Sequence, residues 1–330
     1  MESKMLIPME DYDQYVKMIP SLQYWPGDRD VPHHEIQRVT AVPFYHVGDD
    51  VAIHQEGLMF DKNGDMYFTD IYNSLVRKID MKTGEMSVVV DFPDKNFKIG
   101  AVKFHKDGRM FLAGVDFVND GKAGGIYYCN PDGSDLTCVT TGFSADDMVF
   151  DAEGGIYATN FCGTPIDKRG TIEYITPDLK ERTTYIDGLE GPNGICFNAD
   201  YSTMWITETC GGKVTRVDMN SPRKRLTTSP YRTEGFFGPD SCSCDADGNV
   251  YIAMARQGRI IVLNPNGFLI GEVVTPRCEE GLNLGTTHPQ IRPGTNELYI
   301  TVHDVTGTTG ANIFFCGAFA GANMGQYHLQ

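Results

Sequence analysis

The sequence predicts an all-β fold, a six-bladed β-propeller with four-stranded antiparallel blades. A pattern of strand, tight turn with Asp and Gly, and second strand occurs six times, for example over residues 240–253. One apolar position of this pattern recurs at intervals of 44, 46, 47, 47 and 47 residues, namely at Phe60, Phe104, Phe150, Phe197, Cys244 and Ile291. A fixed period of this length is typical of propeller blades. No segment has a sustained helical period.

We expect an irregular N-terminal lead-in over residues 1–34, followed by a single propeller domain over residues 35–330. A strand over residues 35–47 is expected to complete the last blade, because that blade otherwise keeps an open edge. The six blades are predicted at 56–91, 100–141, 146–186, 193–229, 240–275 and from 287 onward. Their turns carry Gly, Asn, Asp or Pro, which suit the backbone angles of chain reversals. Length alone would favour two domains, but a closed ring of repeats forms one.

Composition limits the classes of function. The 330 residues carry a net charge of −16, which disfavours binding to nucleic acid or to an anionic membrane surface. No apolar run reaches the roughly 18 residues that a spanning helix needs. The nine cysteines are odd in number and include no Cys-x-x-Cys pair, which favours reduced thiols and a cytoplasmic location. We expect a monomer or a small homo-oligomer that acts on a small molecule.

Oxygen-bearing side chains recur at one phase of the repeat, four places before each apolar mark. The six residues there are Glu56, Gly100, Asp146, Asn193, Asp240 and Thr287. Equivalent positions lie at equivalent radii in a propeller, so these side chains are expected to converge on its axis. Three carboxylates and an amide are ligands for a hard cation such as calcium. The alternative, that each is a turn or cap residue, explains any one of them but not four at the same phase.

Four segments resemble the SMP-30/gluconolactonase/luciferin-regenerating-like family, and within it the drug-responsive-protein lactonases. They are the segments 56–61, 146–151, 193–195 and 238–241, and the stretches 238–267 and 287–290 are also similar. The resemblance implies a calcium ion at the centre of the propeller and hydrolysis of lactones. It also implies that Glu56, Asp146, Asn193, Asp240 and Ser241 are the metal ligands and that Asp240 is the acid/base residue. Asp146 is our next candidate for the acid/base role.

One departure from the family concerns a second calcium ion, which those lactonases bind between their second and third blades. Lys122 and Cys138 stand where the family pattern has Ser and Asp. A lysine ammonium cannot ligate calcium, and a thiol is a poor ligand for a hard cation. We therefore expect one tight calcium site, at the propeller axis.

The expected chemistry is metal-assisted opening of a cyclic ester, with Asp240 moving a proton between the attacking water and the leaving alkoxide. Direct attack by a carboxylate is an alternative. His288 is predicted to line the substrate pocket, and His303 to be structural. A carbon–carbon hydrolase of a cyclic diketone and a phosphotriesterase remain alternatives on the same site. A non-catalytic binding propeller does not account for the axial carboxylates.

Overall fold

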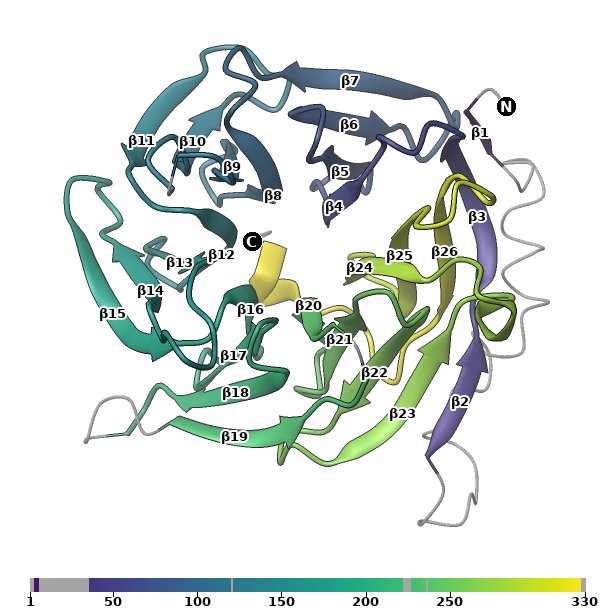
Figure 1. The fold of residues 1–330 in the computed structure, drawn as a ribbon. Helices are drawn as coiled ribbons and strands as arrows, with labels where there is room; N and C mark the ends of the chain where they lie inside the picture. The colour runs from purple at the N-terminus through teal and green to yellow at the C-terminus, as the bar shows by residue number, and fades with distance from the viewer. Residues whose placement is uncertain (1–2, 6–35, 120, 222–226, 236, 328–330) are drawn as a thin grey trace.

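Six small sheets stand around a central axis in the computed structural model, which describes residues 3–5, 36–119, 121–221, 227–235 and 237–327 (Figure 1). Each sheet is a blade. In four sheets the first strand in the chain is the innermost, and in the other two it is an outer strand from the N-terminal part of the chain. The predicted six-bladed propeller is confirmed. The two sheets that the N-terminal part of the chain completes have five strands, and the other four sheets have four.

The strands of each blade follow the chain from the axis outward. Blade one contains β4 (Gln55–Phe60), β5 (Met66–Asp70), β6 (Leu75–Ile79) and β7 (Met86–Asp91). Blade two contains β8 (Lys98–Phe104), β9 (Met110–Val115), β10 (Gly125–Cys129) and β11 (Thr137–Thr141). Blade three contains β12 (Ala145–Phe150), β13 (Ile156–Asn160), β14 (Gly170–Ile175) and β15 (Arg182–Leu189). Blade four contains β16 (Pro192–Phe197), β17 (Thr203–Glu208), β18 (Lys213–Asp218) and β19 (Thr227–Arg232).

The last two blades also recruit strands from the N-terminal part of the chain. Blade five contains β20 (Pro239–Cys244), β21 (Val250–Met254), β22 (Arg259–Leu263), β23 (Leu269–Val274) and, at its outer edge, β2 (Gln37–Thr40). Blade six contains β24 (Gly285–Ile291), β25 (Glu297–His303), β26 (Ala311–Gly317), β3 (Val42–Gly48) and β1 (Lys4–Met5). Two short 3₁₀ helices, η3 (Cys278–Glu280) and η4 (Met324–Tyr327), complete the described elements.

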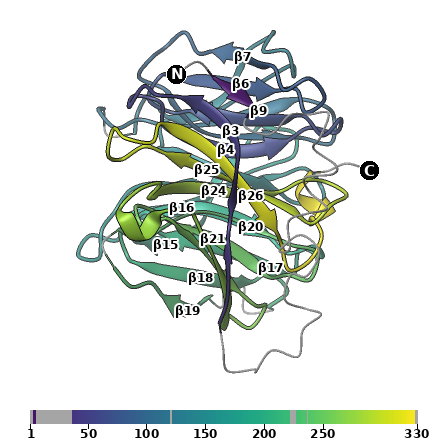
Figure 2. The same ribbon diagram turned by 90° about the vertical axis from the view of Figure 1, so that its right-hand side faces the viewer.

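The strand predicted over residues 35–47 is two strands that serve two blades, so that expectation is corrected. β3 closes blade six by antiparallel pairing with β26, as expected, but β2 pairs in parallel with β23 of blade five. Figure 2 shows this segment running along the outside of both blades. Ala41, which is buried, joins the two strands and donates its N–H to the Val274 carbonyl at 2.9 Å. The division satisfies two exposed sheet edges with one segment. The expected lead-in lies outside the described residues except for 3–5.

The turns predicted from Asp and Gly are held by the carboxylates themselves. The Asp61 carboxylate accepts hydrogen bonds from the backbone N–H groups of Asn63 and Asp65 at 2.8 and 3.0 Å. Asp245 holds the matching turn of blade five through the N–H groups of Asp247 and Asn249. These local bonds replace backbone pairing within the reversal, which is why the turn signal could be read from sequence.

The core consists of the apolar faces of adjacent blades. All six apolar marks of the repeat are at most 6% exposed. Between blades one and six, the ring of Tyr299 receives Phe44 and Phe60 edge-on, at centroid distances of 5.0 and 5.4 Å. Such pairs fix how neighbouring sheets sit against each other and hence where the inner strands meet the axis.

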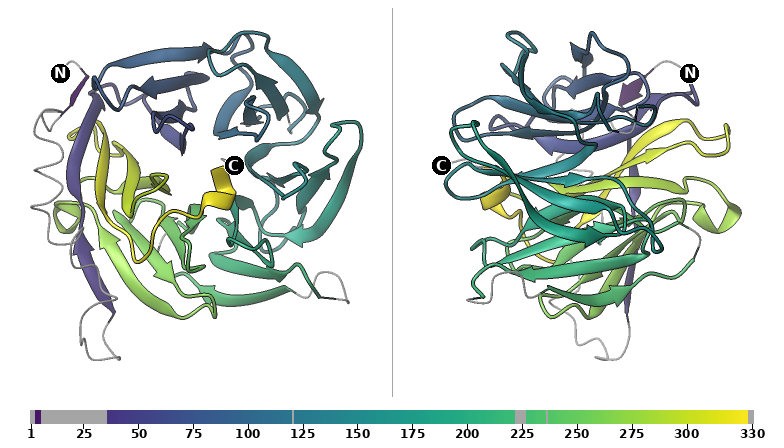
Figure 3. Two further views of the ribbon diagram at one scale, coloured as in Figure 1. Left: turned by 180° about the vertical axis from the view of Figure 1, so that it is seen from behind. Right: turned by 60° about the vertical axis from the view of Figure 1, so that its left-hand side comes forward.

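The C-terminal segment lies across one end of the ring, where Figure 3 shows η4 near the centre. There the Tyr201 hydroxyl donates to the Gly325 carbonyl, and the Asn323 amide donates to the Phe197 carbonyl. These contacts are at the ends of the inner strands, whereas the predicted ligands are at their starts. No helix in the described part of the chain is long and apolar enough to cross a membrane.

Candidate active site

Each of the six inner strands has a register irregularity at the same place in the repeat. The irregularities fall between residues 56 and 59, 99 and 101, 145 and 148, 192 and 195, 239 and 242, and 286 and 289. They coincide with the phase at which the sequence predicted ligands. A bulge bends the strand and re-aims its side chains. The inner strands are therefore irregular at the position of the predicted ligands, which allows their side chains to depart from the alternation of a regular strand.

Threonines in the second strands fix the backbone of these bulges. The Thr207 hydroxyl accepts a hydrogen bond from the Gly194 N–H of its own blade at 2.8 Å and donates one to the Asp240 carbonyl of the next blade. The same arrangement recurs one blade earlier, where the partners lie 3.0 and 2.6 Å from the Thr159 hydroxyl. These hydroxyls couple each ligand position to the blade before it.

Glycine at two inner positions lets the blades approach closely. A Cβ at Gly194 would lie 2.6 Å from the backbone of Ser241 and Cys242. A Cβ at Gly100 would lie 2.5 Å from the Asp146 carbonyl oxygen. Blade two therefore has no side chain at the position where other blades carry predicted ligands, because the backbone of blade three occupies that space.

Glu56, Asp146 and Asp240 share one electrostatic environment. Burial raises the pKa of Glu56 well above its usual range, and the charges of Asp240 and Asp146 raise it further. Burial and the Asp240 charge likewise raise the pKa of Asp146. Burial raises the pKa of Asp240 to about 7, although hydrogen bonds from Asn193 and from the Ser241 N–H favour its ionised form. The structure thus brings the three predicted carboxylates together, and a nearby cation would relieve their repulsion.

Asn193 supplies the observation that tests whether a metal ion fits. Its Oδ1 atom is buried and has no hydrogen-bond partner, which is unfavourable for an amide carbonyl. Three carboxylates and a carbonyl without a partner are an oxygen donor set that suits calcium. Within the described ranges no three His, Cys, Asp or Glu side chains form a compact metal-ligand cluster. Glu56, Asp146 and Asp240 thus interact electrostatically without forming a closed cluster, and the residues fit a hard cation by the chemistry of their oxygen atoms and by charge.

A buried lysine forms an ion pair beside the predicted ligands. The Lys103 ammonium is 3.3 Å from Oδ1 of Asp147, and the two side chains are 10% and 1% exposed. Lys103 also lines a small pocket with Met59, Val149, Cys196, Cys242 and Gln290, among others. His288, predicted to line the substrate pocket, is fully buried, and burial followed by the Lys103 charge lowers its pKa well below the usual range.

Two histidines form one wall of the site beside Glu56. The rings of His54 and His303 stack with centroids 3.7 Å apart and planes 20° from parallel. His54 Nε2 lies 3.4 Å from Oε1 of Glu56. Burial lowers the pKa of His54 well below its usual range and that of His303 to about 4, so both rings are neutral at neutral pH.

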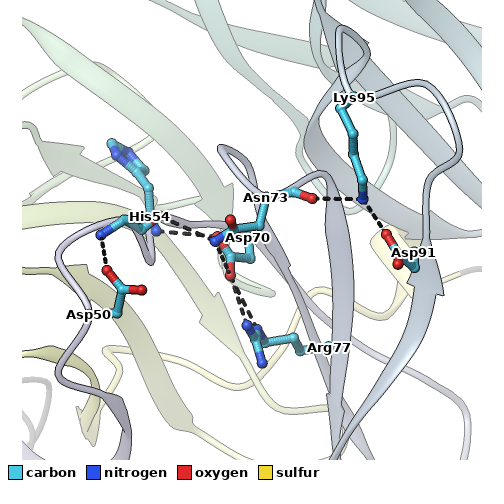
Figure 4. Close-up of polar contacts among 8 residues, drawn as sticks. Asp50, His54, Asp70, Asn73, Arg77, Asp91 and Lys95 are labelled. Atoms are coloured by element: carbon cyan, nitrogen blue, oxygen red, sulfur yellow. Dashed lines mark hydrogen bonds and ion pairs between the residues drawn. The ribbon is translucent and has the colours of Figure 1, made fainter.

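The segment that carries His54 is anchored through Asp70 (Figure 4). The buried Asp70 carboxylate accepts hydrogen bonds from the His54 N–H, the Asn73 amide and the Arg77 guanidinium, at 3.4, 3.0 and 2.9 Å. Figure 4 shows the His54 ring extending away from this network. The network fixes the backbone at the start of blade one, so the ring keeps its place beside Glu56.

Comparison with known proteins agrees with this architecture. Residues 54–304 match the SMP-30/gluconolactonase/LRE-like region. The chain belongs to the SMP-30/gluconolactonase/LRE-like family. Among relatives of the family, a lactonase drp35 of Staphylococcus aureus (strain MRSA252) is 34% identical over 90% of this chain and 92% of its own. The lactonase drp35 of Staphylococcus haemolyticus is 33% identical over 92% of this chain and 96% of its own.

Solved structures show the same fold. A calcium-binding protein, regucalcin, from Agrobacterium tumefaciens superposes with a TM-score of 0.68 at 18% identity, over 88% of this chain and 99% of its own. A gluconolactonase from Xanthomonas campestris gives a TM-score of 0.64 at 16% identity, over the same shares of the two chains.

Three features of the site were not predicted from the sequence. Threonine at the end of the second strands recurs at Thr69, Thr159, Thr207 and Thr301, and this periodicity could have indicated a structural role. Lys103 stands one place before an apolar mark, where it resembles an ordinary solvent-facing lysine. His54 precedes the first ligand by two residues, and no pattern in the sequence links it to His303.

Proposed function

We propose that the protein is a calcium-dependent lactonase that opens a cyclic ester by attack of water. The observation that carries the proposal is the convergence of Glu56, Asp146 and Asp240 beside the Asn193 carbonyl, which lacks a partner. Membership in a family that contains enzymes named lactonase and gluconolactonase supports the reaction class. A protein that only binds a partner would gain nothing from buried, mutually repelling carboxylates.

Glu56, Asp146, Asn193 and Asp240 would hold the ion. The hydroxyl oxygen of Ser241, the next residue, would be a further ligand. A bound calcium ion would polarise the carbonyl of the ester and stabilise the negative charge that develops on its oxygen. Ser241 also donates its backbone N–H to the Asp240 carboxylate, which fixes the direction of that carboxylate.

Asp240 is proposed as the acid/base residue. Its carboxylate takes a proton from the attacking water and returns it to the leaving alkoxide. The hydrogen bonds from Asn193 and Ser241 hold it at the site, and 9% exposure leaves it within reach of a substrate entering from the face of the ligand ring. Asp146 is the second candidate for this role, because it shares the same environment.

A substrate panel with metal control tests the proposal. Purified protein is stripped with EDTA, restored with calcium, and assayed on δ-valerolactone, a cyclic β-diketone and a p-nitrophenyl phosphotriester. We expect turnover of the lactone only after calcium is restored. Preferential cleavage of the diketone or of the phosphotriester would replace the proposal with one of those reactions. Asp132→Asn, in an exposed turn of blade two, is the matched control for substitutions in the ligand set.

Metal stoichiometry is a second readout that does not depend on turnover. We expect one tightly bound calcium per chain, because Lys122 and Cys138 remove oxygen donors between the second and third blades. Two equivalents in dialysed protein would contradict the single site. Loss of the one equivalent in Glu56→Gln, but not in Asp132→Asn, would support the assignment of the ligands.

A further inference from the structure

An arginine stacks on a phenylalanine at the edge of the candidate site. The Arg256 guanidinium carbon lies 4.2 Å from the centroid of the Phe237 ring. Arg256 is in the turn between β21 and β22, and Phe237 is in the linker that leads into β20. Both residues have left-handed backbone angles, with φ of 59° and 68°. Such angles are costly for residues with large side chains and are retained where surrounding contacts impose them.

Gln257 supplies those contacts. Its Nε2 donates hydrogen bonds to the carbonyls of Glu234 and Phe237, at 2.9 and 3.2 Å. Its Oε1 accepts hydrogen bonds from the Arg259 guanidinium at 2.8 and 3.1 Å. One side chain therefore ties the turn that carries Arg256 to the linker that carries Phe237. The stacked pair is pre-oriented before any ligand arrives.

The turn that carries Arg256 lies next to the strand that carries Asp240. Met254, two residues before Arg256, pairs with Pro239, which directly precedes Asp240. On the other side, the Arg256 charge lowers the pKa of both His54 and His303, after burial, which is the larger cause. His54 contacts Glu56. The turn that carries Arg256 therefore lies at the same end of blade five as Asp240.

Within the described part of the chain Arg256 has no acidic partner, although the sequence carries 44 Asp and Glu residues. No carboxylate in the described ranges lies within ion-pair distance of it, and its guanidinium donates no hydrogen bond to a described residue. Arg77 and Arg259, by contrast, each pair with a carboxylate. An exposed, pre-oriented guanidinium offers a planar fork of donors that matches a carboxylate.

We propose that Arg256, supported by Phe237, binds a carboxylate substituent of the substrate, so that the preferred lactones are anionic. This inference rests on the proposed function, because it assigns the substrate class of the same site. The ester carbonyl would face the Asp240 end of the site, and the substituent would extend toward the rim of blade five. The net charge of −16 repels anions at long range, so the preference requires a local cation such as Arg256.

A matched pair of substrates tests the inference. One is γ-butyrolactone with a carboxylate on the carbon next to the ring oxygen, and the other is its neutral carboxamide. We expect the wild type to favour the carboxylate in kcat/KM. Arg256→Gln should reduce the ratio of anionic to neutral kcat/KM by about 10-fold to 100-fold, mainly through KM, as expected for loss of a charge-assisted hydrogen-bond pair. Arg256→Lys should retain part of the preference, because it keeps the charge and loses the fork.

Lys122→Gln is the matched control. It removes one exposed positive charge from the corresponding turn of blade two, on the same face of the propeller. This variant should leave the substrate ratio unchanged. An equal fall in Lys122→Gln and Arg256→Gln would show a general field effect and overturn the inference, as would an unchanged ratio in Arg256→Gln.

A binding measurement separates this inference from the proposed function. Glutarate, an open-chain dicarboxylate, is titrated calorimetrically into calcium-loaded wild type and Arg256→Gln. If neither lactone is opened, the proposed function fails, and the inference is then decided by whether the wild type binds glutarate at least about fivefold more tightly than the variant. Equal affinities would overturn a carboxylate site at Arg256 whatever the enzyme's reaction.

Discussion

The Lys103 ammonium lies 3.3 Å from the Asp147 carboxylate, and both side chains are buried on the inner strands of adjacent blades. Burial raises the pKa of Asp147, and the Lys103 charge opposes that increase. The protein thus has a positive charge of its own, Lys103, beside the group of Glu56, Asp146 and Asp240. The pKa values of all three carboxylates are raised. A buried pair of this kind is destabilised strongly when one partner is removed.

Lys103→Met is therefore expected to lower the free energy of unfolding by about 3–5 kcal/mol, since it leaves the Asp147 carboxylate buried without its counter-ion. Denaturant titration measures the loss. Lys180→Met is the matched control, because Lys180 also lies 3.3 Å from a carboxylate but is 79% exposed. The control should show no measurable change. Equal losses of stability in the two variants would mean that the buried Lys103 pair contributes no more to the free energy of unfolding than an exposed pair.

Asp240→Asn is expected to lower turnover by about 10² to 10⁴, because the amide keeps an oxygen for the ion but loses the basicity that proton transfer needs. Calcium should still bind, although more weakly. Glu56→Gln should act through metal affinity instead, so excess calcium should partly restore its activity. Near-normal turnover of Asp240→Asn at saturating calcium would transfer the acid/base role to Asp146.

Calcium affinity is expected to depend on pH through Asp240. Its pKa is about 7 in the folded protein, against an ordinary value of 3.8, so the folded carboxyl holds a proton between about pH 4 and 7. The ion must displace that proton, and the apparent affinity therefore falls as pH decreases below about 7, by up to about tenfold per pH unit for one proton. Calorimetry in two buffers of different ionisation enthalpy counts the protons released. Asp240→Asn should release about one proton fewer; an unchanged count would contradict the assignment.

Thr207→Val tests the hydroxyl that joins blades four and five. The substitution keeps the side-chain shape and leaves the Gly194 N–H and the Asp240 carbonyl without their shared partner. We expect a loss of about 1–3 kcal/mol in stability, together with weaker calcium binding, because the backbone of a ligand is released. Thr183→Val, at an exposed position of β15, is the control. A variant with normal calcium affinity would show that the hydroxyl stabilises the fold without shaping the site.

The sequence by itself determined the number of blades, their approximate boundaries and the shared repeat position of the candidate ligands. The repeat places one strand pair every 44 to 47 residues, and each pair is held by local turn chemistry at residues such as Asp61 and Asp245. Because these signals act within a few residues, they can be read without knowing how the blades close. The same regularity made Glu56, Asp146, Asn193 and Asp240 stand out as one set.

Only the tertiary structure determined which residues of different blades contact each other. The pairing of Lys103 with Asp147, the stack of His54 on His303 and the place of Arg256 beside that stack each join residues from different blades. The division of the N-terminal segment between blades five and six is of the same kind. Such contacts depend on the angle and spacing of packed sheets, which side-chain volumes across the whole interface set together and which no local pattern encodes.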